Sequence, residues 1–376
     1  KLEQVWMWDD WPDKWGRDCG IDLIARDING KIWAIQAKNY SAEYSVTKHD
    51  IDAFLSESAN EVIGQRLLIA TTDKIATNAV NVIGRSQSNI PVSQLMLSDL
   101  LDAPINWPKS LSDLDSGGLQ QAYTPKPYQR DAIDQVVKNL HSRGQLIMAC
   151  GTGKTLVALW IAEDLNTQTT LVLLPSLLLL SKTLTEWLTH HKKTFSYLPV
   201  CSDETVAKSQ DHINLHVSDL AFPVTTDTAE IANFIQSPGR KVIFSTYQSS
   251  PKIAEAFKHH GLTALDLIIF DEAHRCAGKT DSIYSTGLDD DLIPSRKRLF
   301  MTATPRMYSE NTKTKAAEKD IEITSMDDEK VFGPVLHKLT FGDAIKEDLL
   351  SDYQVVIVGV DNPFYADMVT ERQLVK

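Results

Sequence analysis

The chain has 376 residues, of which 43% are hydrophobic and 23% are charged, and its formal net charge is −12. These values are typical of a globular protein with room for two or three cores, and they exclude a surface that is basic all over. DNA or RNA is not excluded, because a binding channel needs only a local basic lining. The most apolar run, Leu171 to Leu180, is interrupted by Pro175 and is well short of the ~20 residues that span a bilayer, so we expect no membrane partner.

The cysteines are far apart and form no CxxC pair; they are Cys19, Cys150, Cys201 and Cys276. This spacing indicates a reducing cytosol, with neither a disulfide framework nor a zinc site. No signal peptide is recognisable. The chain begins at Lys1 without a Met, and we therefore expect it to be a piece of a longer polypeptide.

The segment GIDLIARDINGKIWAIQAKNY, Gly20 to Tyr40, has the pattern of a β-hairpin, with alternating apolar residues on both sides of a turn at Asp27 to Gly30. Asp22 then comes early in the first strand, while Gln36 and Lys38 share one face of the second. These groups suit metal-dependent phosphodiester hydrolysis. Asp22 and the Gln36 amide oxygen would hold Mg²⁺, and Lys38 would orient or activate the attacking water. The alternative is a plain hairpin in which Asp22 caps a turn and Lys38 is solvated.

This segment resembles the PD-(D/E)xK nucleases, and in particular the Mrr-like branch, in which the pattern G-x-D … Q-x-K carries Gln in place of an acidic residue. The resemblance implies a restriction-endonuclease-like domain over residues 1–104. Because Gln36 brings no charge to the metal, another carboxylate would help, and Glu3 is one candidate.

Further elements fit the same domain: a helix capped by Thr47, a buried strand from Arg66 to Thr72, and a helix from Ala76 to Ile83. We interpret the early tryptophans as packing residues rather than a platform for stacked bases. They are Trp6, Trp8, Trp11 and Trp15. Residues 105–123 are rich in Pro, Ser and Gly, which indicates a linker.

The sequence MACGTGKT, Met148 to Thr155, lies between an apolar run and an amphipathic stretch, as a phosphate-binding loop does. The glycines of the loop let backbone N–H groups approach phosphate oxygens, Lys154 can reach the β and γ phosphates, and the Thr155 hydroxyl can ligate Mg²⁺. The general pattern begins with Gly where this chain has Met148, but the core GTGKT is complete. The sequence therefore predicts an ATP site at Gly151, Thr152, Gly153, Lys154 and Thr155.

Apolar runs at βα spacing predict a parallel sheet with helices on both faces; they are Leu171–Leu174, Lys241–Ser245, Leu265–Phe270 and Arg298–Thr302. The run LIIF is followed directly by Asp271 and Glu272. At a strand end, Asp271 can hold Mg²⁺ through water, and Glu272 can polarise the water that attacks the γ-phosphate. The alternative is that these carboxylates only cap the next helix.

Together these motifs resemble the first RecA-like domain of superfamily 2 DEAH-type helicases and translocases, over residues 124–350. The resemblance implies that Gln129 hydrogen-bonds the adenine edge. It also implies that His274 couples the ATP site to MTATP, where Thr302 and Thr304 relay the state of the γ-phosphate. Four residues would contact the DNA backbone, although each could instead be a helix cap or a solvated polar group. They are Ser176, Lys182, Thr246 and Gln248.

The run His190 to Lys193 we interpret as a solvated face. Residues 351–376 include YQVVIVGV, Tyr353 to Val360, which would begin or lead to a second RecA-like domain that the chain does not complete. We therefore expect weak nucleotide binding and poor hydrolysis, and a strong DNA-stimulated ATPase rate would contradict this.

The order of nuclease before motor resembles the restriction subunit of type I systems and, more closely, the single-polypeptide type ISP restriction-modification enzymes. Type III enzymes place the nuclease after the motor. The closer resemblance rests on GIDLIA … QAKNY, PSLLLLSKTLTEW and DLAFPVTTD (Asp219 to Asp227). It implies an α/β protein of the bacterial or archaeal cytoplasm that moves on double-stranded DNA with ATP and Mg²⁺ and cuts it. Methyltransferase and target-recognition regions would lie further along the same polypeptide.

The rival function is a DNA-remodelling or helicase ATPase whose N-terminal domain binds DNA without cutting it. It differs from the first in whether Asp22, Gln36 and Lys38 hold a metal and cleave. An RNA helicase is a third and less favoured reading, because a nuclease-like N-terminus of this type accompanies DNA enzymes.

Overall fold

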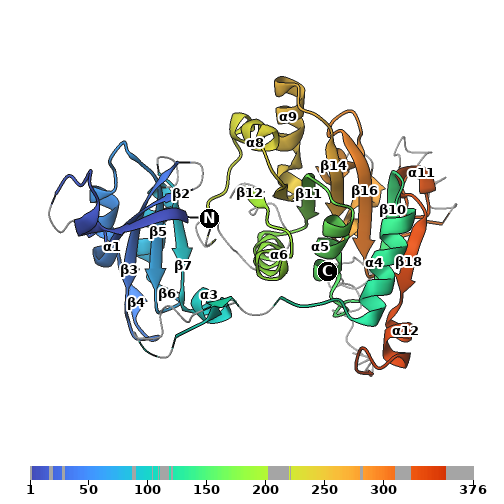
Figure 1. Ribbon diagram of the computed structural model, residues 1–376, viewed down its shortest axis with the longest axis horizontal. Coiled ribbons are helices and arrows are strands. Elements are labelled where there is room, and N and C mark those ends of the chain that lie inside the picture. Colours follow the sequence, from blue (N-terminus) through green and yellow to red (C-terminus); the bar gives the residue numbers. More distant parts are fainter. Residues whose placement is uncertain are drawn as a thin grey trace, which may run out of the picture.

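The structure is a computed structural model that describes residues 2–16, 20–27, 30–86, 90–103, 105–108, 110, 118–119, 122–201, 220, 222–279, 283–309 and 323–352. They form two α/β bodies, each built on its own sheet (Figure 1). The predicted strand at Tyr353 to Val360 lies outside the described residues, as do Cys19, Asp219 and most of the predicted linker.

The N-terminal body has a five-stranded sheet in the order β1-β2-β3-β5-β7. Its strands are β1 (Leu2–Met7), β2 (Leu23–Asp27), β3 (Ile32–Lys38), β5 (Ile63–Ala70) and β7 (Val92–Leu95). The first three pair antiparallel, whereas β3, β5 and β7 run parallel. Shorter pairs join β4 (Ser45–Val46) to β6 (Lys74–Ile75) and β8 (Ile105–Asn106) to β9 (Gly118–Leu119).

The helices of this body are α1 (Lys48–Glu57), α2 (Thr77–Ser86) and α3 (Leu97–Asp102), with a 3₁₀ turn η1 (Trp8–Asp10). As predicted, Thr47 caps α1, in a capping box with Asp50. Ile51 of α1 and Ala79 of α2 pack on Leu68 of the sheet in one buried cluster. The parallel strands are therefore joined by helical crossovers that leave their carboxyl ends at one edge.

Tryptophans of the N-terminal segment form part of the core, which supports packing over base stacking. Trp8 and Trp11 are 4% and 5% exposed. The Trp15 ring lies edge-on to both, with centroid distances of 5.0 and 5.4 Å. Glu3, in contrast, forms an ion pair with Arg26 near the start of β1, where Leu2 pairs with Asp27. Asp22 lies beyond the opposite end of the β1–β2 ladder, where Met7 pairs with Leu23. Glu3 is therefore too far along the strand to be the extra metal ligand.

The C-terminal body has a seven-stranded parallel sheet in the order β12-β13-β11-β14-β16-β10-β18. The strands are β10 (Arg143–Met148), β11 (Thr169–Leu174), β12 (Ser196–Val200), β13 (Lys241–Thr246), β14 (Leu265–Phe270), β16 (Ser295–Thr302) and β18 (Val335–Leu339). A small pair joins β15 (Gly278–Lys279) to β17 (Ile323–Thr324). All four predicted strands are present, which confirms the predicted fold class.

The helices of this body are α4 (Pro127–Asn139), α5 (Lys154–Asp164), α6 (Leu177–His190), α8 (Thr228–Gln236), α9 (Ser250–His260), α11 (Glu329–Phe332) and α12 (Phe341–Lys346). Its 3₁₀ turns are η4 (Tyr247–Ser249), η5 (Ala273–Cys276) and η6 (Ile283–Leu288). Among the helices that the structure describes, none is long and apolar enough to cross a membrane.

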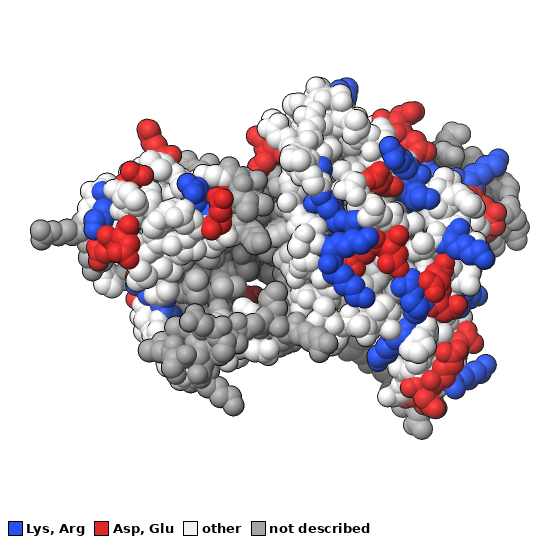
Figure 2. Space-filling view, in the orientation of Figure 1, with Lys and Arg blue, Asp and Glu red and all other residues white. Residues whose placement is uncertain are grey.

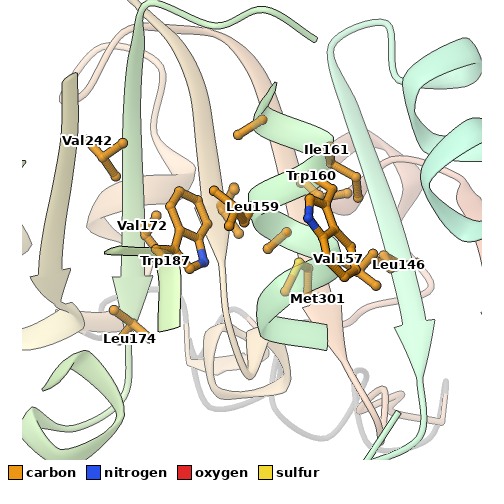
Figure 3. Packing of buried hydrophobic residues seen from close by; sticks show 14 of the residues in the cluster. Leu146, Val157, Leu159, Trp160, Ile161, Val172, Leu174, Trp187, Val242 and Met301 are labelled. Atoms are coloured by element: carbon orange, nitrogen blue, oxygen red, sulfur yellow. The ribbon is translucent and has the colours of Figure 1, made fainter. Parts of the chain in front are cut away.

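Helix α5 is buried on nearly all sides, although its sequence suggested an amphipathic helix. Every residue from Val157 to Glu163 is buried. Figure 3 shows Leu159 and Trp160 of α5 among side chains that come from the sheet and from α6, including Trp187. The indole of Trp187 also donates to the Thr155 carbonyl at 3.0 Å. The helix that follows the phosphate-binding loop is thus fixed within the core.

The run His190 to Lys193 is a solvated face only in part, since Lys192 and Lys193 are exposed but the histidines are not. His190 is 8% exposed and its ring stacks on Tyr123 at a centroid distance of 4.2 Å. The backbone N–H groups of Lys192 and Lys193 donate to the buried carboxylate of Glu163 at 2.6 and 2.8 Å. These residues close the end of α6 against α5.

Candidate active sites

The first candidate site lies at the carboxyl end of β3, the central strand of the N-terminal sheet. Asp22 directly precedes β2, and its N–H donates to the Ile35 carbonyl at 2.9 Å. Its carboxylate accepts the N–H of Ala37 at 2.7 Å. Because Ala37 stands between Gln36 and Lys38, this bond brings the three predicted residues together.

The amide of Gln36 is held in one orientation. Gln36 is 1% exposed, and its Nε2 donates to the Gly20 carbonyl at 2.9 Å. Its Oε1 is buried and has no hydrogen-bond partner among the residues that the structure describes. A buried acceptor left unpaired carries a free-energy cost, and oxygen atoms are the ligands that Mg²⁺ prefers. The residues therefore fit a hard cation, with Gln36 and Asp22 as its protein ligands.

Gly20 is required by its surroundings as well as by its backbone. Its φ is +73°, and a Cβ there would lie 3.2 Å from the Cβ of Ala53. A side chain would push the Gly20 carbonyl away from Gln36. In the described part of the chain, no group of three or more His, Cys, Asp or Glu side chains could hold a metal.

Sequence reasoning missed a network that supports the turn after Lys38. Asp50 accepts hydrogen bonds from the Thr47 backbone at 2.7 Å and from the hydroxyls of Tyr40 and Tyr44, both at 3.1 Å. Burial, and then the bond to Asp50, raise the pKa of Tyr40 to about 12. The acidic residue three positions after Thr47 is the capping-box signal that could have revealed it.

The second candidate site follows β10. Gly151 and Gly153 have φ values of +82° and +81°, and Lys154 opens α5. The Lys154 ammonium group donates to the Met148 carbonyl at 3.2 Å. Thr152 is 1% exposed, and its hydroxyl donates to the Ala149 carbonyl at 2.7 Å. This strand, turn and helix form the predicted phosphate-binding loop.

Gln129 contacts this loop directly. Its Nε2 donates to the Thr152 carbonyl at 3.0 Å, and its Oε1 accepts the Lys126 N–H at 2.9 Å. The φ of +81° at Gly153 favours glycine, and a Cβ there would lie 2.5 Å from that Nε2, so the Gln129 side chain would have to shift. The structure thus gives Gln129 a role in holding the loop, while its contact with adenine stays a prediction.

The DEAH residues follow β14 at the same edge of the sheet. Burial and then Glu272 raise the pKa of Asp271 to about 6, and Lys154 opposes this shift. The Glu272 carboxylate lies 3.3 Å from His274 Nδ1, and that hydrogen bond holds the pKa of Glu272 below its usual range. Glu272 precedes η5 but makes no side-chain capping bond, so the plain capping alternative is not what the structure shows.

His274 links this site to β16. Its Nδ1 lies 3.0 Å from Thr302 Oγ1, which also accepts the Thr304 N–H at 3.2 Å. Thr302 is fully buried and Thr304 is exposed. The predicted relay residues are therefore in contact.

Three of the four predicted DNA contacts lie at the ends of β11 and β13, the fourth is on α6, and most have partners within the protein. Ser176 caps α6 by accepting the Leu179 N–H at 3.4 Å. Thr246 is 3% exposed and donates to Ser249 Oγ at 3.1 Å, while Gln248 donates to the Tyr284 hydroxyl at 3.4 Å. Lys182 on α6 is exposed. Their contacts with DNA stay predictions.

Sequence reasoning missed Tyr247, whose hydroxyl donates to the Asp271 carbonyl at 2.7 Å. A tyrosine beside a buried strand has no local signal of this role. On the face seen in Figure 2, Lys and Arg side chains are interleaved with Asp and Glu over the coloured part of the molecule. This face is therefore not basic all over.

Replacing the half-buried carboxylate of Asp271 should separate the effects on stability from those on nucleotide binding. Its raised pKa means that ionising Asp271 costs folding free energy above about pH 6, a cost absent below its usual value of 3.8. We expect Asp271→Asn to raise Tm at pH 7.5 by about 2–4 °C, since it removes a poorly solvated charge. Mg²⁺-dependent nucleotide binding should be lost. Calorimetry and a nucleotide titration measure both; a lower Tm at pH 7.5 would contradict the charge argument.

The two parts of the chain match two families of known proteins. Residues 1–115 match a family of restriction endonucleases, and residues 122–307 match the res subunit of type III restriction enzymes. The structure of the ATP-dependent type ISP restriction-modification enzyme LlaBIII bound to DNA is similar over 94% of this chain and 24% of that one, with 32% identity and a TM-score of 0.78.

Curated relatives include the probable helicase A859L of African swine fever virus (isolate Pig/Kenya/KEN-50/1950), 27% identical over 83% of this chain and 33% of its own length. The endonuclease subunit of the type I restriction enzyme EcoAI from Escherichia coli is 26% identical over 63% of this chain and 24% of its own length. The chain thus spans a quarter to a third of these relatives. It carries a restriction-endonuclease domain followed by a helicase-like domain, and it is similar in structure to the type ISP restriction-modification enzymes, as its sequence motifs predicted.

Proposed function

We propose that this chain is the nuclease and motor portion of an ATP-dependent DNA restriction enzyme. Residues 1–104 cleave phosphodiester bonds with Mg²⁺, residues 105–123 link the two parts, and residues 124–350 use ATP to move on duplex DNA. Residues 351–376 lead towards a second RecA-like domain. Methyltransferase and target-recognition regions belong to the same longer polypeptide, in a bacterial or archaeal cytoplasm.

The observation that carries the proposal is the Gln36 Oε1, which is buried without a partner among the described residues, next in sequence to Ala37, whose N–H the Asp22 carboxylate accepts. Unpaired buried acceptors are uncommon and each calls for an explanation, which a bound cation would supply here. Asp22 and Gln36 hold the cation, which supplies positive charge at the scissile phosphate when bound. Lys38, at the end of β3, orients the water and balances charge as the bond breaks.

In the motor, the loop from Gly151 to Thr155 binds the phosphates, and Gln129 holds the loop through its bond to the Thr152 carbonyl. Thr155 and Asp271 hold the Mg²⁺ that accompanies ATP, and Glu272 polarises the attacking water. The bond between His274 and Thr302 passes the state of the site to β16. Ser176, Lys182, Thr246 and Gln248 contact the DNA backbone and set the position of the motor on it.

The rival is a remodelling ATPase with a non-cleaving DNA-binding domain. It is favoured by the fact that the described residues gather no group of three or more acidic, His or Cys side chains. The two functions differ in one measurable property, which is cleavage by the N-terminal domain.

The test is nicking of supercoiled plasmid by this chain with Mg²⁺ or Mn²⁺, with and without ATP, compared with Lys38→Ala. We expect metal-dependent nicking that falls at least about a hundredfold in the variant, as for removal of a group that stabilises developing charge. Equal nicking by both proteins would point to a contaminating nuclease. No nicking by either, at high protein concentration, would favour the rival.

A further inference from the structure

Tyr247 connects two strand ends that are not neighbours. It is fully buried at the start of η4, directly after β13, and its ring centroid lies 5.4 Å from that of Tyr284. Its hydroxyl donates to the Asp271 carbonyl, which follows β14. Since β11 lies between β13 and β14, this bond bridges the end of the intervening strand.

The peptide that Tyr247 holds is the one that sets the direction of Glu272. The Asp271 N–H donates to the Leu173 carbonyl at 2.9 Å, and the Asp271 carbonyl accepts the bond from Tyr247. Both backbone groups of Asp271 are therefore held. Glu272 has φ 49° and ψ 47°, a left-handed conformation that is unfavourable for residues with a Cβ. Such a conformation persists only where the surroundings hold it.

The turn that carries Tyr247 is itself tied together. Ser250 Oγ donates to the Tyr247 carbonyl at 2.7 Å, and Thr246 donates to Ser249 across the turn. Thr246 and Gln248, on either side of Tyr247, are the residues assigned above to DNA. A displacement of this turn by DNA must therefore move the Tyr247 hydroxyl as well.

We propose that Tyr247 is a positioning residue that couples the DNA-contacting turn to Glu272. This rests on the proposed function of the motor. When the turn is seated on DNA, the bond from Tyr247 holds the Asp271 carbonyl, and the peptide plane then keeps the Glu272 carboxylate directed at the γ-phosphate. Tyr247 touches neither DNA nor nucleotide, so its effect is on the linkage between the two sites.

The test compares Tyr247→Phe with the unaltered chain and with Tyr197→Phe, a matched tyrosine on β12 whose pKa is also raised by burial. Affinities for a duplex oligonucleotide and for the Mg²⁺ complex of a non-hydrolysable ATP analogue are measured alone and together. We expect a coupling factor of about fivefold or more in the unaltered chain and in Tyr197→Phe, within the usual range of allosteric coupling. In Tyr247→Phe the factor should fall to about one, with each separate affinity changed by less than about twofold.

A second measurement addresses Glu272 itself. Single-turnover hydrolysis of ATP, with protein in excess over nucleotide, should slow by about tenfold in Tyr247→Phe, which removes the hydroxyl that bonds the Asp271 carbonyl and also meets the Cys276 thiol. Thermal denaturation of both variants identifies a general loss of structure.

The outcomes are distinct. Undiminished coupling in Tyr247→Phe, or no coupling in an unaltered chain that binds both ligands, would overturn the inference alone. A fall in both separate affinities together with Tm would assign Tyr247 a merely structural role and overturn it too. An unaltered chain that binds no nucleotide would overturn the proposed function of the motor, and this inference with it.

Discussion

Asp22→Asn should slow Mg²⁺-dependent DNA cleavage by about a thousandfold, the effect of losing several kcal/mol of charge stabilisation at the metal. The Asn side chain keeps an oxygen that can accept the Ala37 N–H, so the hairpin stays intact. It lacks the negative charge that holds a divalent cation beside Gln36. The rate of plasmid nicking measures the effect, and calorimetric titration with Mn²⁺ should show that metal binding is lost.

The matched control is Asp52→Asn. Asp52 lies on α1 in an exposed ion pair with Lys48, and such pairs contribute little to stability. Cleavage and metal binding should be unchanged in this variant. If Asp22→Asn cut as fast as the unaltered chain, the nuclease would not use this edge of the sheet and the non-cleaving rival would stand.

Lys154→Ala should weaken binding of Mg²⁺-ATP by about a hundredfold, because it removes charge-assisted hydrogen bonds to two phosphates. The Lys154 ammonium group already points into the loop, at 3.2 Å from the Met148 carbonyl. The buried residues of helix α5 begin at Val157 and do not include Lys154, so the fold should be retained. A titration with a fluorescent ATP analogue measures the affinity.

Cys150 gives a second measurement of the same effect. It is exposed in the loop, whereas Cys201 and Cys276 are buried. ATP should slow alkylation of Cys150 in the unaltered chain and have no effect in Lys154→Ala. Lys252→Ala, which removes an exposed ion pair with Glu255 on α9, should keep full protection. Equal protection in Lys154→Ala would place the nucleotide elsewhere.

Residues whose positions depend on a short stretch of chain could be placed from the sequence. The turn that brings Asp22 opposite β3 is local, and so is the strand, loop and helix around Lys154. The acids after β14 needed only the rule that ligands gather at the carboxyl ends of parallel strands. In each case the neighbouring backbone determines where the side chain goes.

Contacts between distant segments could not be predicted in this way. The burial of α5 on all sides depends on α6 and the sheet, and the bond from Gln129 to Thr152 depends on how α4 packs. Tyr247 gives the clearest example, because its partner Asp271 lies two strands away in the sheet. Its polar neighbours suggest an exposed turn, and only the tertiary packing turns its ring inward.

The strand order also fixes the distance between the phosphate-binding loop and Glu272. β16 is the only strand between β10, which leads to the phosphate-binding loop, and β14, which leads to Glu272. Since adjacent strands lie about 4.8 Å apart, the two strand ends are separated sideways by roughly 10 Å. Loop changes elsewhere cannot alter this spacing while the sheet is intact. A nucleotide that has lost its terminal phosphate can still fill the loop but extends less far towards Glu272, so the sheet itself distinguishes the two forms.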